Sequence, residues 1–429
     1  MVLSLAKKNW YMIRRAKRKR KRLIVLASCS YSSRLKARPR RRMVWAERVA
    51  SLTPFEFRRR YRITLEGFNE ILRDIENAMP RVPANMPKAV PNELKLSMAL
   101  RWMAGGSYLD IADMHGVSDK TFYQHVWQVI EAVHKSYDLK LLELLKPENV
   151  RNGSLEKLAE GFDRKSPNGV MSGCIGALDG LAVKLEKRAL KDEGDKGKFY
   201  CRKGFYSLNF LWCSSRTCGS THDSMALELT ELGAILRDAA HPLNNSDYWF
   251  AGDDAYKGPA NNSDSLLTPY EGRSLDAAHD AFNAWQSKLR IEVECAFGAL
   301  VHRWGILHRK LSVRPLRHVT TLMSALCKLH NKCMECQMPE HKGRVMSDRY
   351  GSAPPPAKGA GGADLFGVDW AEWRLAPKFF DPATRIPAGS RRRQRMRDIL
   401  RDRLDEVRLR RPATSSYRGY TAGADEAAE

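Results

Sequence analysis

The chain has 429 residues, of which 43% are apolar and 28% charged, so it can bury a sizeable core and is neither disordered throughout nor fibrous. The longest aliphatic run near its N-terminus, residues 23–27, is too short for a membrane span or a secretory signal, and we expect no membrane association. The net charge of +24 is uneven: residues 1–60 hold 20 Lys or Arg and two acids, a net of +18. This concentration indicates a phosphate-rich partner.

The first 52 residues are expected to form a basic, disordered arm. Lys17, Arg18, Lys19 and Arg20 belong to an unbroken run of six basic residues. Such runs bind DNA phosphates by counterion release or act as nuclear import signals, and a solvated tail that aids solubility is the alternative. We therefore expect these side chains to contact DNA and the protein to reside in the nucleus.

Residues 53–140 are predicted to be helical. Apolar residues recur at helical spacing from Thr53 until Met79-Pro80, and four prolines from Pro80 to Pro91 mark a linker. Three shorter helices are predicted next, over residues 93–104, 108–115 and 119–134.

The second and third of these helices resemble a helix-turn-helix. Ser107 and Ser118 are suited to cap them, and Gly116 supplies the turn between them. The third helix would enter the major groove and present Asp119 and three candidate DNA contacts, which are Lys120, Tyr123 and Gln124. A plain helical bundle packed on the next domain is the alternative.

From residue 173 onward the pattern favours short strands alternating with helices. Residues 174–178 indicate a buried strand that delivers Asp179 at its end, and residues 181–185 a strand that returns beside it. Asp253 ends a second unit of this kind. The remaining predicted elements are a strand over 206–212, helices over 224–237, 277–308 and 319–336, and an Arg-rich, mostly disordered tail over 338–429.

Four acids stand out by position. Asp179 and Asp253 end strands, Asp223 follows a Gly-Ser loop, and Glu294 lies inside a helix. Carboxylates that converge from separate segments repel one another unless a cation offsets their charge, and Mg²⁺ prefers such oxygen ligands. Taken singly, each acid has an ordinary explanation as a turn residue or a solvated helix residue.

Seven motifs in a fixed order resemble the DDE endonuclease domain of PIF/Harbinger-type transposases and their domesticated relatives. The resemblance spans about residues 92–336 and implies an α/β, RNase H-like DDE nuclease domain over 165–337. An all-α helix-turn-helix domain precedes it, and basic flexible termini flank the two. The motifs are Gly176-Ala177-Leu178-Asp179-Gly180, Arg202-Lys203-Gly204-Phe205-Tyr206-Ser207-Leu208-Asn209, Gly219-Ser220-Thr221-His222-Asp223-Ser224, Gly252-Asp253-Asp254-Ala255-Tyr256, Leu267-Thr268-Pro269-Tyr270, Arg290-x-x-x-Glu294-x-x-Phe297-Gly298 and Leu329-His330-Asn331.

The resemblance assigns roles to these residues. Asp179, Asp253 and Glu294 match the catalytic acids, and Asp223 matches a further metal ligand, so the four would hold Mg²⁺ or Mn²⁺. Asp254 is the neighbouring rival of Asp253. Arg290 lies one turn before Glu294, where it would orient that carboxylate or meet a DNA phosphate.

The implied function is that of a DNA transposase or a transposase-derived nuclease, which hydrolyses phosphodiester bonds and transfers strands at transposon ends. A domesticated, catalytically impaired DNA-binding or chromatin-associated protein is the alternative. The expected partners are DNA, a Myb-like DNA-binding protein and a second copy of the chain.

The region between residues 204 and 219 departs from the family pattern. The family has a strand, a turn and another strand there, whereas only residues 206–212 indicate a strand in this sequence. We therefore expect about ten residues, roughly one strand, to be missing, and DNA cleavage to be weak or absent as a result.

Overall fold

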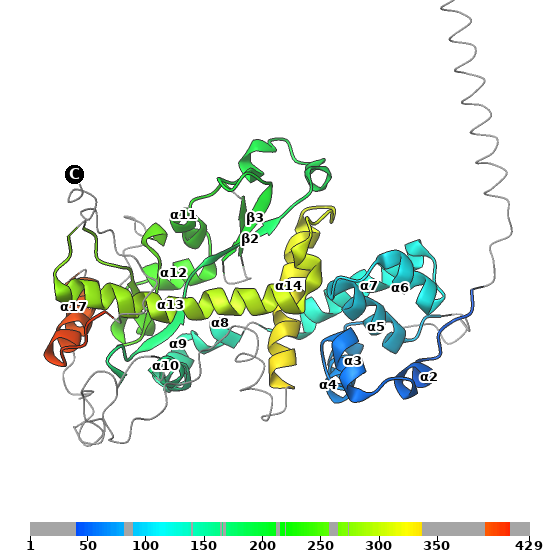
Figure 1. The fold of residues 1–429 in the computed structure, drawn as a ribbon, viewed down its shortest axis with the longest axis horizontal. Helices are drawn as coiled ribbons and strands as arrows, with labels where there is room; N and C mark the ends of the chain where they lie inside the picture. The colour runs from blue at the N-terminus through cyan, green and yellow to red at the C-terminus, as the bar shows by residue number, and fades with distance from the viewer. Residues whose placement is uncertain are drawn as a thin grey trace, which may run out of the picture.

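The computed structural model describes residues 40–80, 89–138, 140–163, 165, 169–211, 215–218, 220–256, 265–272, 274–336 and 391–411. Its mixture of helices and sheets agrees with the expected α/β class (Figure 1). Within these ranges, no helix combines the length and apolarity that a membrane crossing requires.

The first helices are shorter than the apolar pattern suggested. A reciprocal pair of bonds between Thr53 and Glu56 caps α3, and Arg62 ends it in a left-handed conformation with φ 67°. The continuous helix expected from residue 53 to 79 is therefore two helices. Their bounds are Pro54–Tyr61 for α3 and Leu65–Glu76 for α4.

The expected disordered arm does not extend to residue 52. Residues Trp45–Ala50 form helix α2, and the Trp45 ring stacks on Phe68 of α4 with centroids 4.8 Å apart. This aromatic contact provides the packing energy that a short helix lacks by itself. Lys17, Arg18, Lys19 and Arg20 lie outside the described residues.

The next three helices lie where the sequence predicts them. Gly116 adopts φ 65° after the second helix, and the Ser118 side chain caps the third by accepting from the Thr121 amide. Ser107 makes no side-chain cap bond, contrary to expectation. The helices are α5 (Asn92–Met103), α6 (Tyr108–His115) and α7 (Asp119–Ser136).

Two three-stranded sheets follow three short connecting helices, α8 (Lys140–Leu144), α9 (Pro147–Arg151) and α10 (Glu156–Asp163). In the parallel sheet, the strand order is β1-β5-β6, and in the antiparallel sheet it is β2-β3-β4. The strands are β1 (Cys174–Ala177), β2 (Gly180–Lys184), β3 (Ser207–Leu211), β4 (Ser215–Cys218), β5 (Trp249–Ala251) and β6 (Leu266–Leu267).

The chain passes from one sheet into the other between β1 and β2. The Leu178 amide still donates to Ala251 of the parallel sheet at 2.8 Å, and β2 then pairs along β3. The expectation that this segment returns beside β1 is therefore wrong. Asp179 lies at the crossing point.

The strand that the sequence analysis counted as missing is present. β4 pairs antiparallel with β3 through four residue pairs, from Leu208↔Cys218 to Leu211↔Ser215. Its Ser-Arg-Thr-Cys sequence resembles a loop because it lacks alternating apolar residues. Pairing with β3 nevertheless satisfies its backbone, so the physical ground for expecting weak cleavage no longer holds.

The helix expected over 224–237 is broken at Leu229-Thr230 into α11 (Asp223–Glu228) and α12 (Glu231–Arg237). The long helix α13 (Ala277–Arg303) then crosses the molecule and contacts both β1 and β5 (Figure 1). Its successor α14 (Arg317–Glu335) packs on α7, where Lys328 donates to the His134 carbonyl oxygen at 2.7 Å.

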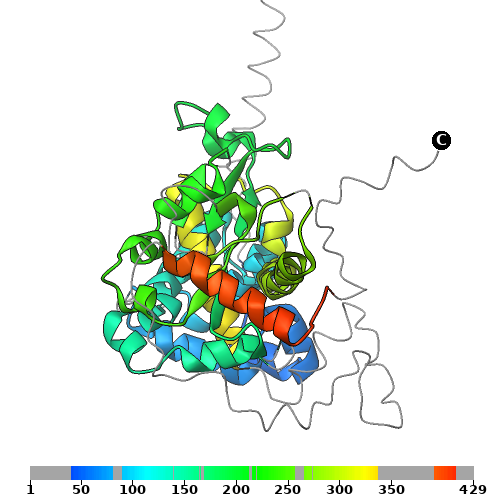
Figure 2. The ribbon, with the colours of Figure 1, turned by 90° about the vertical axis from the view of Figure 1, so that its left-hand side faces the viewer.

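An ordered helix interrupts the tail that was expected to be mostly disordered. Helix α17 (Arg391–Glu406) lies against α13, as the view in Figure 2 makes clear. Leu400 and Leu404 are fully buried in a core shared with Phe282 and Trp285 of α13. These two leucines, four residues apart, provide the apolar face that the Arg-rich composition obscured.

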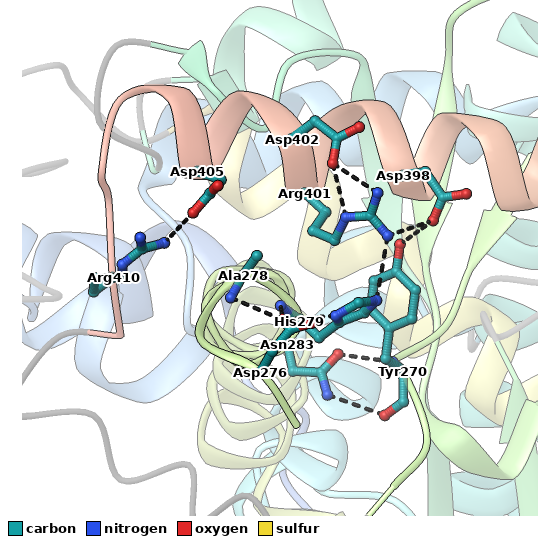
Figure 3. A network of polar contacts seen from close by, with 10 residues as sticks. All are labelled: Tyr270, Asp276, Ala278, His279, Asn283, Asp398, Arg401, Asp402, Asp405 and Arg410. Carbon is teal, nitrogen blue, oxygen red and sulfur yellow. Dashed lines mark hydrogen bonds and ion pairs between the residues drawn. The ribbon is translucent and has the colours of Figure 1, made fainter. Parts of the chain in front are cut away.

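Polar contacts fasten α17 to the rest of the fold (Figure 3). The Tyr270 hydroxyl donates to Asp398 at 2.6 Å, and the Arg397 guanidinium lies 4.0 Å from the centre of the Tyr270 ring. Arg401 reaches the His279 ring nitrogen Nε2 at 3.2 Å. The helix is therefore held by both apolar and charged contacts.

Candidate active site

Asp179 is the most deeply placed of the candidate acids. Its Oδ1 accepts from the Gly180 amide at 2.8 Å. Burial raises the pKa of Asp179, and the negative charges of Glu294 and Asp253 raise it further. The Gly180 hydrogen bond and the Arg290 charge oppose this rise in the pKa. Three other candidate residues therefore lie within electrostatic range of this carboxyl group.

Asp253 follows β5 directly and forms an ion pair with Arg290. Its Oδ1 lies 3.2 Å from Arg290 Nη1, and the Arg290 side chain is only 12% exposed. One turn earlier on α13, the buried Gln286 donates to the carbonyl oxygens of Gly252 and Leu267 at 2.8 and 3.1 Å. Gln286 thus fixes α13 to the ends of both β5 and β6.

Asp223 is the first residue of α11 and is held from the antiparallel sheet. Asn209 of β3 donates from Nδ2 to Asp223 Oδ1 at 2.7 Å. A Cβ atom on Gly180 would come within 2.7 Å of Asn209 Oδ1, so this close approach requires glycine. Asn209 Oδ1 itself is buried and has no hydrogen-bond partner among the described residues.

Tyr256 lies at the centre of the acidic site. Its side chain is 1% exposed, and burial raises the pKa of its hydroxyl far above the usual range. Asp223, Asp179 and Asp253, in that order, raise the pKa further, whereas Arg290 lowers it. Three aspartates from three separate segments therefore lie within electrostatic range of one buried tyrosine.

Glu294 completes the acidic site from α13. It is exposed and lies one turn after Arg290, and its charge reaches Asp179. The structure thus brings the predicted acids Asp179, Asp223, Asp253 and Glu294 to one region together with Arg290. Their catalytic and metal-binding roles stay predictions.

Sequence reasoning missed three residues of this region. Asn209 and Tyr256 both stand at the ends of motifs that carry the family resemblance, which was the available signal. Gln286 lies outside those motifs, and nothing in the sequence marks it. Their contributions depend on contacts between distant segments, which spacing along the chain does not reveal.

The donor set suits a hard divalent cation. All four acids offer carboxylate oxygens. Burial raises the pKa of Asp179, the charges of Glu294 and Asp253 raise it further, and a bound cation would offset both effects. In the described part of the chain, no three or more His, Cys, Asp or Glu side chains are grouped closely enough to hold a metal ion. The acids therefore share a region without forming a closed set of ligands.

The predicted DNA contacts on α7 are accessible. Lys120, Tyr123 and Gln124 are exposed, whereas the adjacent Phe122 is buried in the helical core. Arg290, in contrast, is largely buried and paired with Asp253. A role for Arg290 with a DNA phosphate would require that ion pair to open.

Comparisons with known proteins agree with the site. Residues 178–331 match the DDE superfamily endonuclease family. The chain is also 23% identical over 309 residues to "Protein ALP1-like" of Arabidopsis thaliana, a match that covers 66% of this chain and 71% of that protein. No solved structure matches it. Residues 178–331 therefore match a DDE superfamily endonuclease domain, which agrees with the resemblance of the chain's motifs to Harbinger-type, transposase-derived nucleases.

Proposed function

We propose that this protein is a Mg²⁺- or Mn²⁺-dependent DNA nuclease with an RNase H-like catalytic domain, which hydrolyses phosphodiester bonds and transfers strands at transposon ends. The observation that carries the proposal is the convergence of Asp179, Asp223 and Asp253 around Tyr256. Glu294 is within electrostatic range of the first. The site lies where the chain crosses between two sheets, so its geometry depends on the whole fold.

Each residue has a distinct task in this proposal. Asp179, Asp223, Asp253 and Glu294 would hold the cation, which when bound supplies the charge that activates water and stabilises the leaving oxygen. Asn209 orients Asp223 through its hydrogen bond. Gln286 keeps α13, and with it Glu294, in register with β5.

DNA recognition in this proposal combines two parts of the chain. The exposed residues Lys120, Tyr123 and Gln124 of α7 would contact the duplex as the third helix of a helix-turn-helix. The basic run over residues 17–22 would add phosphate contacts and nuclear import. A Myb-like partner and a homo-oligomer are further proposals that rest on the family resemblance.

One observation favours a second candidate function, a domesticated DNA-binding protein that no longer cuts. Arg290 forms an ion pair with Asp253 at 3.2 Å, which would compete with a metal ion for this carboxylate. The described acids also do not group closely enough for a metal site. A protein that kept the fold but lost metal binding would have these features.

A nicking assay with supercoiled DNA separates the two functions. The full chain is incubated with Mg²⁺ or Mn²⁺, and Glu294→Gln is compared with Glu292→Gln on the same helix, whose carboxylate instead pairs with Lys165 at 3.0 Å. Cleavage that Glu294→Gln abolishes and Glu292→Gln retains supports the nuclease. DNA binding without any metal-dependent cleavage supports the domesticated protein.

A further inference from the structure

A cleft separate from the candidate active site lies at the end of β2 that is farther from the acids. It has a volume of about 620 Å³, which is within the range of small-ligand sites. Three basic and three aromatic side chains line most of it, namely Lys187, Arg188, Lys310, Tyr200, Phe205 and Tyr206. None of the four candidate catalytic acids contributes to its walls.

Its distance from the acids follows from the strand between them. Asp179 directly precedes β2, and Leu185, which lines the cleft, directly follows it. Six residues of strand at about 3.3 Å each place the cleft roughly 20 Å from Asp179.

Backbone hydrogen bonds from separate segments build the floor of the cleft. The Leu185 amide donates to the Tyr206 carbonyl oxygen at 2.7 Å, and the Glu186 amide donates to that of Leu311 at 2.9 Å. The Leu311 amide in turn donates to the Lys184 carbonyl oxygen at 2.9 Å. The floor is therefore fixed before any ligand arrives.

Two tyrosines form an aromatic wall. Tyr200 and Tyr206 pair through a β-bridge, and their rings meet edge to face with centroids 5.2 Å apart. Tyr206 is partly buried, but Tyr200 remains 50% exposed. The contact with Tyr206 orients Tyr200 and leaves much of its ring available for stacking.

The charges of the cleft favour an anion. Glu186 is the only acid among the lining residues, and it is ion-paired with Arg188. Lys187 and Lys310 are exposed and have no carboxylate partner among the described residues. These two ammonium groups are therefore available for a phosphate.

The cleft adjoins the exposed face of α7. Arg188 lies close enough to Tyr123 for its charge to lower the pKa of that hydroxyl, against the larger effect of burial, which raises it. Tyr123 is 38% exposed and neighbours Lys120 and Gln124, the predicted duplex contacts. Arg188 of the cleft and the predicted duplex contacts on α7 are therefore near enough for one DNA molecule to meet both.

We propose that this cleft binds one unpaired nucleotide of the DNA, roughly 20 Å from the candidate catalytic acids, with its base on Tyr200 and its phosphate between Lys187 and Lys310. In a duplex the faces of each base are covered by its neighbours, so only an unpaired base can stack on the ring. The proposal rests on the proposed function, because it takes DNA as the ligand.

Fluorescence of 2-aminopurine tests the proposal, because its emission changes when the base stacks. The full chain is bound, in EDTA so that no cleavage occurs, to a duplex with a single-stranded extension that carries 2-aminopurine at successive positions. We expect a position-dependent loss of emission with the wild-type protein. Tyr200→Leu should abolish it and weaken binding of the extension about 10-fold.

Lys187→Gln combined with Lys310→Gln should reduce the salt dependence of binding by a slope of about 1.4, since each contact with single-stranded phosphate contributes about 0.7. Phe55→Leu and Lys157→Gln are matched controls, because both residues are exposed elsewhere in the fold. Neither control should change the emission or the salt slope.

Three results would overturn the proposal: equal emission for wild type and Tyr200→Leu, no dependence on position, or a larger effect with RNA of the same sequence. Cleavage of blunt duplex provides an independent readout. The control Phe55→Leu should cut it as wild type does, and a wild type that fails to cut speaks against the nuclease function alone, because the emission is measured without cleavage.

Discussion

Asn209 on β3 holds Asp223 at the start of α11 through a 2.7 Å hydrogen bond, so the antiparallel sheet fixes the orientation of a carboxylate that belongs to a helix. The bond crosses between two elements that the sequence separates by a strand and a loop. It has two consequences, one for activity and one for metal binding.

Asn209→Ala should lower metal-dependent nicking and metal affinity by about 10- to 100-fold, because an unsupported ligand loses its orientation. The melting temperature without metal should change little. Asn149→Ala serves as the control, because the side chain of this asparagine donates to the Glu143 carbonyl oxygen, away from the acids. Equal metal affinity in wild type and Asn209→Ala would show that Asp223 needs no support.

Asp179→Asn should stabilise the metal-free protein at neutral pH. Because burial and like charges raise the pKa of Asp179, the folded state binds its proton more readily than the unfolded state does. The charged carboxylate therefore opposes folding above that pKa, and the gain from the substitution should shrink as the pH falls through it. Urea denaturation at several pH values measures the difference.

The same substitution should abolish the rise in melting temperature that Mg²⁺ or Mn²⁺ gives the wild type, since a cation that binds only the folded state stabilises it. Asp254→Asn, at the exposed rival position, should keep that rise. Loss of the rise in Asp254→Asn but not in Asp253→Asn would exchange the roles of these two neighbours.

His115 should make the helical region sensitive to acid. Its ring is fully buried between Ser97 and the Ile111 carbonyl oxygen, and burial lowers its pKa to about 4. The His115 ring therefore binds a proton near pH 6.5 in the unfolded chain, whereas in the folded chain it stays neutral until the pH is much lower. Between pH 6.5 and 4 this residue should cost up to about 1.4 kcal/mol of unfolding free energy per pH unit.

His115→Gln should flatten this dependence in chemical denaturation, whereas His308→Gln, at an exposed histidine, should leave it unchanged. Partial burial also lowers the pKa of His330 to about 4, so some dependence on pH is expected to remain in His115→Gln. An identical slope in wild type and His115→Gln would contradict the prediction.

Leu404→Ala should destabilise the protein by about 2–5 kcal/mol, because Leu404 is fully buried between α17 and α13. The control is Leu229→Ala, since Leu229 is 70% exposed and its truncation should be nearly neutral. A neutral result for Leu404→Ala in urea denaturation would mean that α17 does not pack on α13 in solution.

Elements with local signals could be predicted from the sequence. The predicted helix over 108–115 and the two strands that end in Asp179 and Asp253 agree with the structure, because caps, glycines and apolar runs mark their ends. Strand β4 could not be predicted, because only its pairing with β3 makes it a strand.

The candidate site divides in the same way. The motifs identify the acids one by one, but the position of Tyr256 among three of them depends on how α11, β5 and the β1–β2 crossing pack together. Helix α17 was missed because ten arginines dominate residues 391–411 and hide the pair Leu400 and Leu404. Composition describes a surface well and a narrow buried stripe poorly.

The docking of α17 also bears on how such a gene can evolve. The family match ends at residue 331, yet leucines some 70 residues further on complete the hydrophobic core that α17 shares with α13. A frameshift or an early stop codon between the two would spare every catalytic acid and still remove part of the protein's interior. Natural selection for an intact fold should therefore extend at least to Leu404, well beyond the region that defines the family.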